Sequence, residues 1–188
     1  MRLLAKQHVL PHSLCNLPAL PLCPSCAFGG CKRRPWRTKD KHGSIRKADH
    51  SSPGFLVCTD QLVSSQPGLV PRSSGCLTTS LIWACNVFLD VHAGYCYGYM
   101  MRSTSLDQTV AAKCAFESKM VKHNVKVKEH RADNERFADL GFKLEVEKCN
   151  QKITYCGVGA HGQNGIIERH IGKITVRRRI MLLHAKHF

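Results

Sequence analysis

Three acidic residues stand where carboxylates could do metal-dependent chemistry. Asp60 lies in an apolar segment, Asp133 follows an alternating segment, and Glu168 follows a glycine-rich loop. Clustered carboxylates repel one another, so a divalent cation is their natural compensation. Hard oxygen ligands without a histidine cluster favour Mg²⁺ or Mn²⁺ over zinc, and two such ions support phosphodiester chemistry. These residue types predict a two-ion Mg²⁺ or Mn²⁺ site.

The strand expected at residues 55–61 carries the first of these acids. Its alternation places Asp60 on the same face as Leu56 and Cys58. An acid on the apolar face of a strand costs free energy unless it has a partner or a function. Taken alone, Asp60 is more simply interpreted as an edge-strand acid turned to solvent.

Asp133 follows the alternating residues 125–132, which predict a strand that ends at this carboxylate. A helix should come next, with Glu135 in its first turn. We expect its buried stripe to consist of Phe137, Leu140, Gly141 and Leu144.

A short strand at residues 153–156 and a loop with three glycines then lead to Asn164, a possible N-cap. Glu168 falls in the first turn of the last helix, expected at residues 165–184. The expected apolar stripe of this helix consists of Ile167, Ile171, Ile174 and Met181.

The middle of the chain predicts two strands and a helix. Residues 81–91 and 95–101 read as strands joined by a turn at residues 92–94, after a polar connection at residues 63–79. Asp90, at the end of the first strand, is a rival metal ligand, but strand ends commonly carry a turn-forming Asp. A helix should span residues 106–123 and pack on the sheet through Leu106, Val110, Cys114 and Val121.

Several motifs resemble those of one protein family and occur in the same order. RADN contains Asp133 and RFAD follows it, ITYCGVGAH comes next, and QNGIIER contains Glu168, with 34 residues between Asp133 and Glu168. They resemble the retroviral-integrase and transposase family, and most closely the integrase of copia-type retrotransposons, from about Pro21 onward. The resemblance assigns Asp60 as the first of three catalytic acids. It leaves outside the triad the other acids Asp90, Glu135 and Asp139.

The resemblance implies an α/β fold, a ribonuclease-H-like mixed sheet with flanking helices, preceded by a short Cys-containing basic segment. The implied catalytic core spans residues 51–188, after an N-terminal segment at residues 1–50, in a fragment or degenerate copy of a polyprotein. The implied reaction removes terminal nucleotides from element DNA and then joins the new 3′-hydroxyl to target DNA. Glu135 replaces a glycine usual in the family, and this acid could either aid ion capture or distort the site. The implied catalytic and metal-binding residues are Asp60, Asp133 and Glu168.

Cys23 and Cys26 form a C-x2-C pair, a spacing that lets two thiolates bind one zinc ion. His8 and His12 precede the pair and could complete four ligands. In copia-type integrases the His pair lies further upstream, so a remnant knuckle or free thiols are the alternatives. Because half a site binds weakly, we expect little or no Zn²⁺ on Cys23 and Cys26 in the isolated chain.

Basic residues indicate a nucleic-acid partner, with double-stranded DNA expected. Lys and Arg number 28 against 13 Asp and Glu, a formal net charge of +15, and counterion release would drive binding to a polyanion. A basic arm at residues 31–47 would follow phosphates, or would simply be a solvated linker. Residues expected to contact DNA are Lys32, Arg33, Arg34, Trp36, Arg37, Asn164, Arg177, Arg178 and Arg179.

Composition argues against membrane and secreted classes. The longest apolar run, residues 81–91, is well short of the ~20 residues that cross a bilayer. Eleven scattered cysteines indicate reduced, buried thiols in a nuclear or cytoplasmic protein. Two functions remain: a metal-dependent integrase core, or a catalytically inert basic fragment that binds nucleic acid. Homo-oligomerisation is compatible with both.

Overall fold

The computed structural model describes most of the second half of the chain and parts of the first. Two compact units divide the chain: one is Arg46–Glu168, and the other joins Met1–Ile45 to Arg169–Phe188. The division at residues 50 and 51 stays a prediction. The described residues are 24–30, 52–71, 77–134, 137–156 and 164–186.

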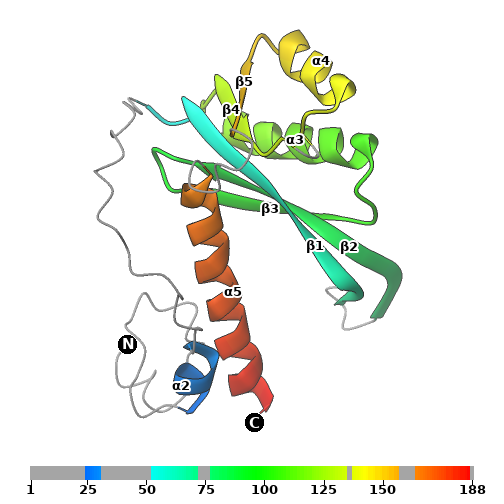
Figure 1. Ribbon diagram of the computed structural model, residues 1–188, viewed down its shortest axis with the longest axis vertical. Helices are drawn as coiled ribbons and strands as arrows, with labels where there is room; N and C mark the ends of the chain where they lie inside the picture. The colour runs from blue at the N-terminus through cyan, green and yellow to red at the C-terminus, as the bar shows by residue number, and fades with distance from the viewer. Residues whose placement is uncertain (1–23, 31–51, 72–76, 135–136, 157–163, 187–188) are drawn as a thin grey trace. The chain divides into compact units, whose positions relative to one another are not determined.

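A five-stranded mixed sheet forms the larger unit (Figure 1). Its strands are β1 (Leu56–Pro71), β2 (Leu77–Asp90), β3 (Cys96–Met101), β4 (Glu129–Ala132) and β5 (Lys152–Tyr155). Their order is β3-β2-β1-β4-β5; the first three strands pair antiparallel, whereas β4 pairs parallel with both β1 and β5. This arrangement confirms the ribonuclease-H-like mixed sheet.

The helices after the third strand follow in the expected order, whereas α2, before the first strand, was not predicted. They are α2 (Pro24–Gly30), α3 (Leu106–Val121), α4 (Leu140–Lys148) and α5 (Gly165–Lys186). The polar connection expected at residues 63–79 is wrong in part, because β1 and β2 extend into it and pair Gly68 with Ile82 and Leu69 with Leu81. Residues 125–128 lie outside β4, which is shorter than expected.

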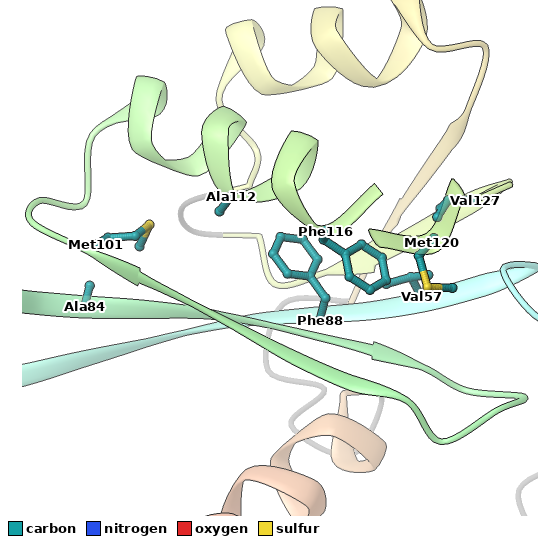
Figure 2. Packing of buried hydrophobic residues seen from close by; sticks show 8 residues of the cluster. All are labelled: Val57, Ala84, Phe88, Met101, Ala112, Phe116, Met120 and Val127. Carbon is teal, nitrogen blue, oxygen red and sulfur yellow. The ribbon is translucent and has the colours of Figure 1, made fainter. Parts of the chain in front are cut away.

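The main core lies between α3 and one face of the sheet. Phe88 of β2 and Phe116 of α3 are both fully buried, with stacked rings 4.9 Å apart at their centroids. Figure 2 shows these rings between the helix and the strands, with Val57 and Met120 beside them. The expected packing face of α3 was wrong in part, because Cys114 is exposed and Val121 is 64% exposed.

A second core joins α4 to the β4 and β5 end of the sheet. The expected stripe of α4 was wrong: Leu140 is 70% exposed and Leu144 is 47% exposed, whereas Phe142 and Val146 are buried. The helix starts five residues beyond Glu135, at Leu140, because the Asp139 side chain accepts the Gly141 amide and caps the helix there.

Contact with α3 explains which face of α4 is buried. A Cβ atom at Gly141 would lie 2.3 Å from a Leu106 methyl group, so glycine permits the two helices to approach closely. Leu106 and Val110 of α3 pack against the α4 core instead of the main core. The α3 helix therefore contributes side chains to two cores, whereas the sequence predicted a single apolar stripe.

Behind β4, a buried polar network connects α3 to the β5 end of the sheet. The Glu117 carboxylate lies 3.1 Å from the Lys113 ammonium and 3.0 Å from His130 Nε2, and it accepts the Gln151 amide at 2.9 Å. Lys113 also lies 3.3 Å from the Cys149 sulfur. Lys113 and His130 are fully buried, so these hydrogen bonds compensate for groups removed from water.

Stability should fall as the pH drops from about 7.5 to 5.5, because burial lowers the pKa of His130 despite its hydrogen bond to Glu117. The unfolded chain takes up this proton near pH 6.5, before the native state does, so acid favours unfolding. His130→Gln keeps a donor for Glu117 and should flatten the curve. Thermal unfolding across this pH range measures the effect, with the exposed His123→Gln as control. A His130→Gln curve as steep as the wild-type curve would contradict the assignment.

In the smaller unit, α2 packs against the C-terminal half of α5. Buried Cys26 and Ile180 pack together, with Val176 beside them. The expected α5 stripe was wrong in part: Ile174 is 42% exposed and Met181 is 39% exposed. The zinc pair stays a prediction, because Cys23, His8 and His12 lie outside the described residues. Within the described part of the chain, no helix combines the length and apolar character needed to cross a membrane.

Candidate active site

Asp60 lies near the centre of the sheet, on β1 between β2 and β4. As predicted, it shares a face with Leu56 and Cys58, which are both buried. This face is opposite the one that packs against α3. Asp60 is half-buried, and its Oδ1 accepts the Gln61 amide at 2.8 Å. A central strand thus presents one carboxylate from an apolar surface.

Asp133 comes directly after β4 and is exposed, as expected for a carboxylate at a strand end. Backbone contacts with Cys156 hold the chain on both sides of it. The Cys156 amide donates to the Ala132 carbonyl at 3.1 Å, and the Asn134 side-chain amide donates to the Cys156 carbonyl at 3.1 Å. These contacts fix the backbone of Asp133 and leave its side chain in solvent.

The strand register places Asp60 and Asp133 on the same sheet face. Cys58 pairs with Arg131 in the parallel register of β1 and β4, and each acid stands two residues further along its own strand. Side chains two residues apart point to the same face, and neighbouring strands lie about 4.8 Å apart. Tertiary pairing therefore brings together two acids that are far apart in sequence.

Glu168 is exposed on the first turn of α5. Its amide donates to the Asn164 carbonyl at 3.2 Å, and the fully buried Ile167 anchors the turn. Asn164 directly precedes the helix, as expected, and is 5% exposed. Its Oδ1 has no hydrogen-bond partner among the described residues, so it does not cap the helix as expected. The adjoining glycine-rich loop lies outside the described residues.

The charges of Asp133 and Glu168 both act on Asp60. Burial raises the pKa of Asp60 above its usual range, and the charges of Asp133 and Glu168 raise it further, against the hydrogen bond from Gln61. Burial also raises the pKa of Cys156, as do all three carboxylates. Asp60 and Asp133 therefore share one sheet face, and the charge of Glu168 on α5 acts on Asp60 from the helix.

The donor chemistry of these acids fits Mg²⁺ or Mn²⁺, which prefer hard oxygen ligands. Among the described residues, however, no group of three or more His, Cys, Asp and Glu side chains is arranged to hold a metal ion. The charges of Asp133 and Glu168 reach Asp60, but these described side chains do not form a group that could hold an ion together. Asp133 and Glu168 are exposed, so their side chains can rotate toward Asp60 without disturbing the core.

Asp60→Asn should stabilise the protein without divalent metal, raising the unfolding temperature by about 2–4 °C. Because the native pKa of Asp60 is raised, its ionisation destabilises the fold above that pKa, and the neutral amide removes this cost. Differential scanning fluorimetry at pH 7 measures the change. Added MgCl2 should raise the unfolding temperature of the wild type but not of Asp60→Asn. The exposed Asp107→Asn serves as control; an Asp60→Asn protein no more stable than wild type would refute the prediction.

Asp90, the rival ligand, belongs to a different part of the sheet. It is fully buried and pairs with Val57, three residues from Asp60 along β1, or about 10 Å. Its Oδ1 accepts the His92 amide at 3.2 Å, which is the turn-forming role expected at a strand end. Residue 135 lies outside the described residues, so the effect of Glu135 stays open.

Few of the expected DNA contacts fall on described residues. Arg177, Arg178 and Arg179 are exposed in the smaller unit, whereas the side chain of Asn164 is buried. The arm that carries Trp36 lies outside the described residues. These assignments stay predictions. Sequence reasoning also passed over Arg131, although the strand period of two places it on the face of Asp133.

No protein-family model matches the sequence, and no curated protein matches it. Solved structures from several retroviruses are similar to the fold. An intasome of simian T-cell lymphotropic virus, in complex with the PP2A regulatory subunit B56 gamma, matches 91% of this chain with 14% identity and a TM-score of 0.49. This chain spans 56% of the length of that protein chain.

Two integrase catalytic core domains are also similar. The core of HTLV-2 integrase in complex with magnesium matches 68% of this chain and 83% of its own, with 14% identity and a TM-score of 0.41. The core of BIV integrase matches 70% of this chain and 81% of its own, with 12% identity and a TM-score of 0.46. At these low scores, the fold assignment rests on the strand order and strand directions.

Proposed function

We propose that the chain is the catalytic core of an integrase-type polynucleotidyl transferase that cuts and joins double-stranded DNA with divalent metal ions. The observation that supports the proposal is that the strand register puts Asp60 and Asp133 on one sheet face, while the charge of Glu168 also acts on Asp60. The charges of Asp133 and Glu168 raise the pKa of Asp60, so the ionised acids destabilise the fold. A binding or catalytic role would account for acids placed at this cost.

A different structural feature holds each acid in place. Asp60 is fixed by the central strand, Asp133 by the backbone contacts of Cys156, and Glu168 by the buried Ile167 in the same helical turn. They would hold the Mg²⁺ or Mn²⁺ ions, which when bound supply an activated oxygen nucleophile and neutralise the leaving oxygen. Rigid supports matter because a misplacement of about 1 Å can cost a hundredfold in rate.

The specific reaction we propose is that of a copia-type retrotransposon integrase: processing of 3′ ends, followed by strand transfer into target DNA. It is supported by the sequence motifs around Asp133 and Glu168 and by the net charge of +15. The proposed partners are the element ends and the target, both double-stranded DNA, with a second copy of the chain as a further candidate.

A second function is a basic nucleic-acid-binding fragment without catalysis. One observation favours it: the described residues contain no group of acids arranged to hold a metal ion. Under this proposal the positive charge binds DNA, and the carboxylates remain without their ions.

Two measurements on the full chain separate these functions. Affinity for a random-sequence duplex should fall steeply as NaCl rises from 50 to 200 mM, because phosphate contacts release counterions. Supercoiled plasmid should be nicked with MnCl2 or MgCl2 and left intact with EDTA. Binding without nicking would select the inert fragment, and a flat salt dependence would contradict phosphate contacts in both proposals.

A further inference from the structure

Arg131 is a cation on the carboxylate face of the sheet. It stands two residues before Asp133 on β4 and pairs with Cys58 of β1, two residues before Asp60. Strand alternation therefore directs its side chain to the same face as both acids. Arg131 is half-buried, so its side chain is held partly by its neighbours and remains open to solvent.

The surroundings of Arg131 leave its guanidinium available. No ion pair of the described residues includes Arg131. Glu129 and Asp133 flank Arg131 on its own face, and the Glu129 carboxylate accepts the Thr154 hydroxyl at 2.8 Å. Thr154 is the residue that pairs with Arg131 in the register of β4 and β5. Among the described residues, neither of these carboxylates forms an ion pair with Arg131.

The charge of Arg131 also acts on Cys156, as the charges of the three acids do. Its charge lowers the pKa of Cys156, the thiol on which Asp60, Asp133 and Glu168 act in the opposite direction. An arginine on the sheet face of Asp60 and Asp133, in no ion pair of the described residues, offers a planar fork of donors to an anion that enters the site.

We infer that Arg131 binds a phosphate of the DNA strand that enters the carboxylate site. The inference rests on the proposed function, because the ligand is the nucleic acid of that reaction. Carboxylates repel the phosphate backbone, and a guanidinium two residues from Asp133 offsets this repulsion at the point where the strand must approach. Arginine suits the task because it can donate two parallel hydrogen bonds to one phosphate. Arg131 is a substrate-positioning residue and does not take part in proton transfer.

The test measures binding to a short duplex in which a single neutral methylphosphonate is stepped along one strand. Fluorescence anisotropy compares the wild type with Arg131→Gln, Arg131→Lys and Lys119→Gln. Lys119 is exposed on α3, away from the carboxylate face, so it controls for the loss of one positive charge. Circular dichroism and the unfolding temperature show whether each variant is folded.

Arg131→Gln should bind unmodified duplex about tenfold more weakly than wild type, with a salt slope smaller by about 1. One methylphosphonate position should weaken the wild type and Lys119→Gln but leave Arg131→Gln unchanged. Arg131→Lys keeps the charge and the fold, and should lose about threefold because it lacks the bidentate fork. Arg131→Gln or Arg131→Lys binding like Lys119→Gln at every position would overturn the inference.

Failure of this inference can be told apart from failure of the proposed function. A wild type that shows the Arg131 coupling but never nicks plasmid would retain the phosphate contact and refute the transferase. A wild type that nicks plasmid, with Arg131→Gln unaffected in binding and in KM, would refute the phosphate contact alone. Absence of measurable DNA binding by the wild type would refute both.

Discussion

Alanine at Asp60, Asp133 or Glu168 is expected to abolish Mn²⁺-dependent nicking of supercoiled plasmid, lowering the rate by at least about 10³-fold. A loss of this size is about 4 kcal/mol of transition-state stabilisation, reasonable for removal of one ligand from a two-ion site. Affinity for duplex DNA should stay within about threefold of wild type, because each change removes a negative charge and no phosphate contact. Agarose-gel nicking and anisotropy measure the two effects separately.

Two acids provide matched controls for the triad. Asp107→Asn removes an exposed charge from the first turn of α3, and nicking should be unchanged. Asp90→Asn keeps the shape of a buried side chain and its acceptor for the His92 amide, so nicking should also persist. More than about a tenth of wild-type activity in any triad variant would remove that acid from the site. Loss of nicking in Asp90→Asn, with normal folding, would make Asp90 a ligand after all.

Phe116→Ala should destabilise the larger unit by about 3–5 kcal/mol, the largest stability effect expected from a single substitution here. Phe116 is fully buried, its ring stacks on Phe88 at 4.9 Å, and the Tyr97 ring lies 5.9 Å away, so truncation leaves a cavity in the main core. A typical domain has only 5–15 kcal/mol of stability, so part of the population would unfold. Urea unfolding followed by circular dichroism measures the free energy.

Two further substitutions in α3 calibrate that result. Phe116→Leu keeps much of the apolar volume and should cost clearly less than alanine. Val121→Ala changes a side chain that is 64% exposed, and should shift the free energy of unfolding by no more than about 0.5 kcal/mol. A Phe116→Ala cost near that of Val121→Ala would mean that α3 does not pack on the sheet through this ring.

The order of elements and the local setting of each acid followed from the sequence. Alternation around Asp60 predicted its strand and its face, and the structure confirms both. Asp133 at a strand end and Glu168 in a first helical turn were also predicted and are observed. These features depend on periods of two or 3.6 residues and on nearby turn formers, so a short window of sequence contains them.

Burial of particular helix faces could not be predicted in the same way. The stripe expected on α4 contained Leu140 and Leu144, yet Phe142 and Val146 are the buried residues. On α3, Lys113 is fully buried because it reaches Glu117 and Cys149, a compensation that depends on α4 and the sheet. A helix with apolar residues on several sides has more than one possible stripe, and only its neighbours select which stripe is buried.

The sequence by itself determined three carboxylates, each on an element suited to present it, and a strongly basic chain. Only the tertiary structure decided that Asp60 and Asp133 share one sheet face, that Asp90 lies elsewhere, and that Arg131 stands on that face without an acidic partner among the described ion pairs. The physical reason is that parallel pairing of β1 with β4 is a long-range choice. This pairing depends on the summed burial of both sheet faces, and the alternating pattern within either strand does not specify its partner.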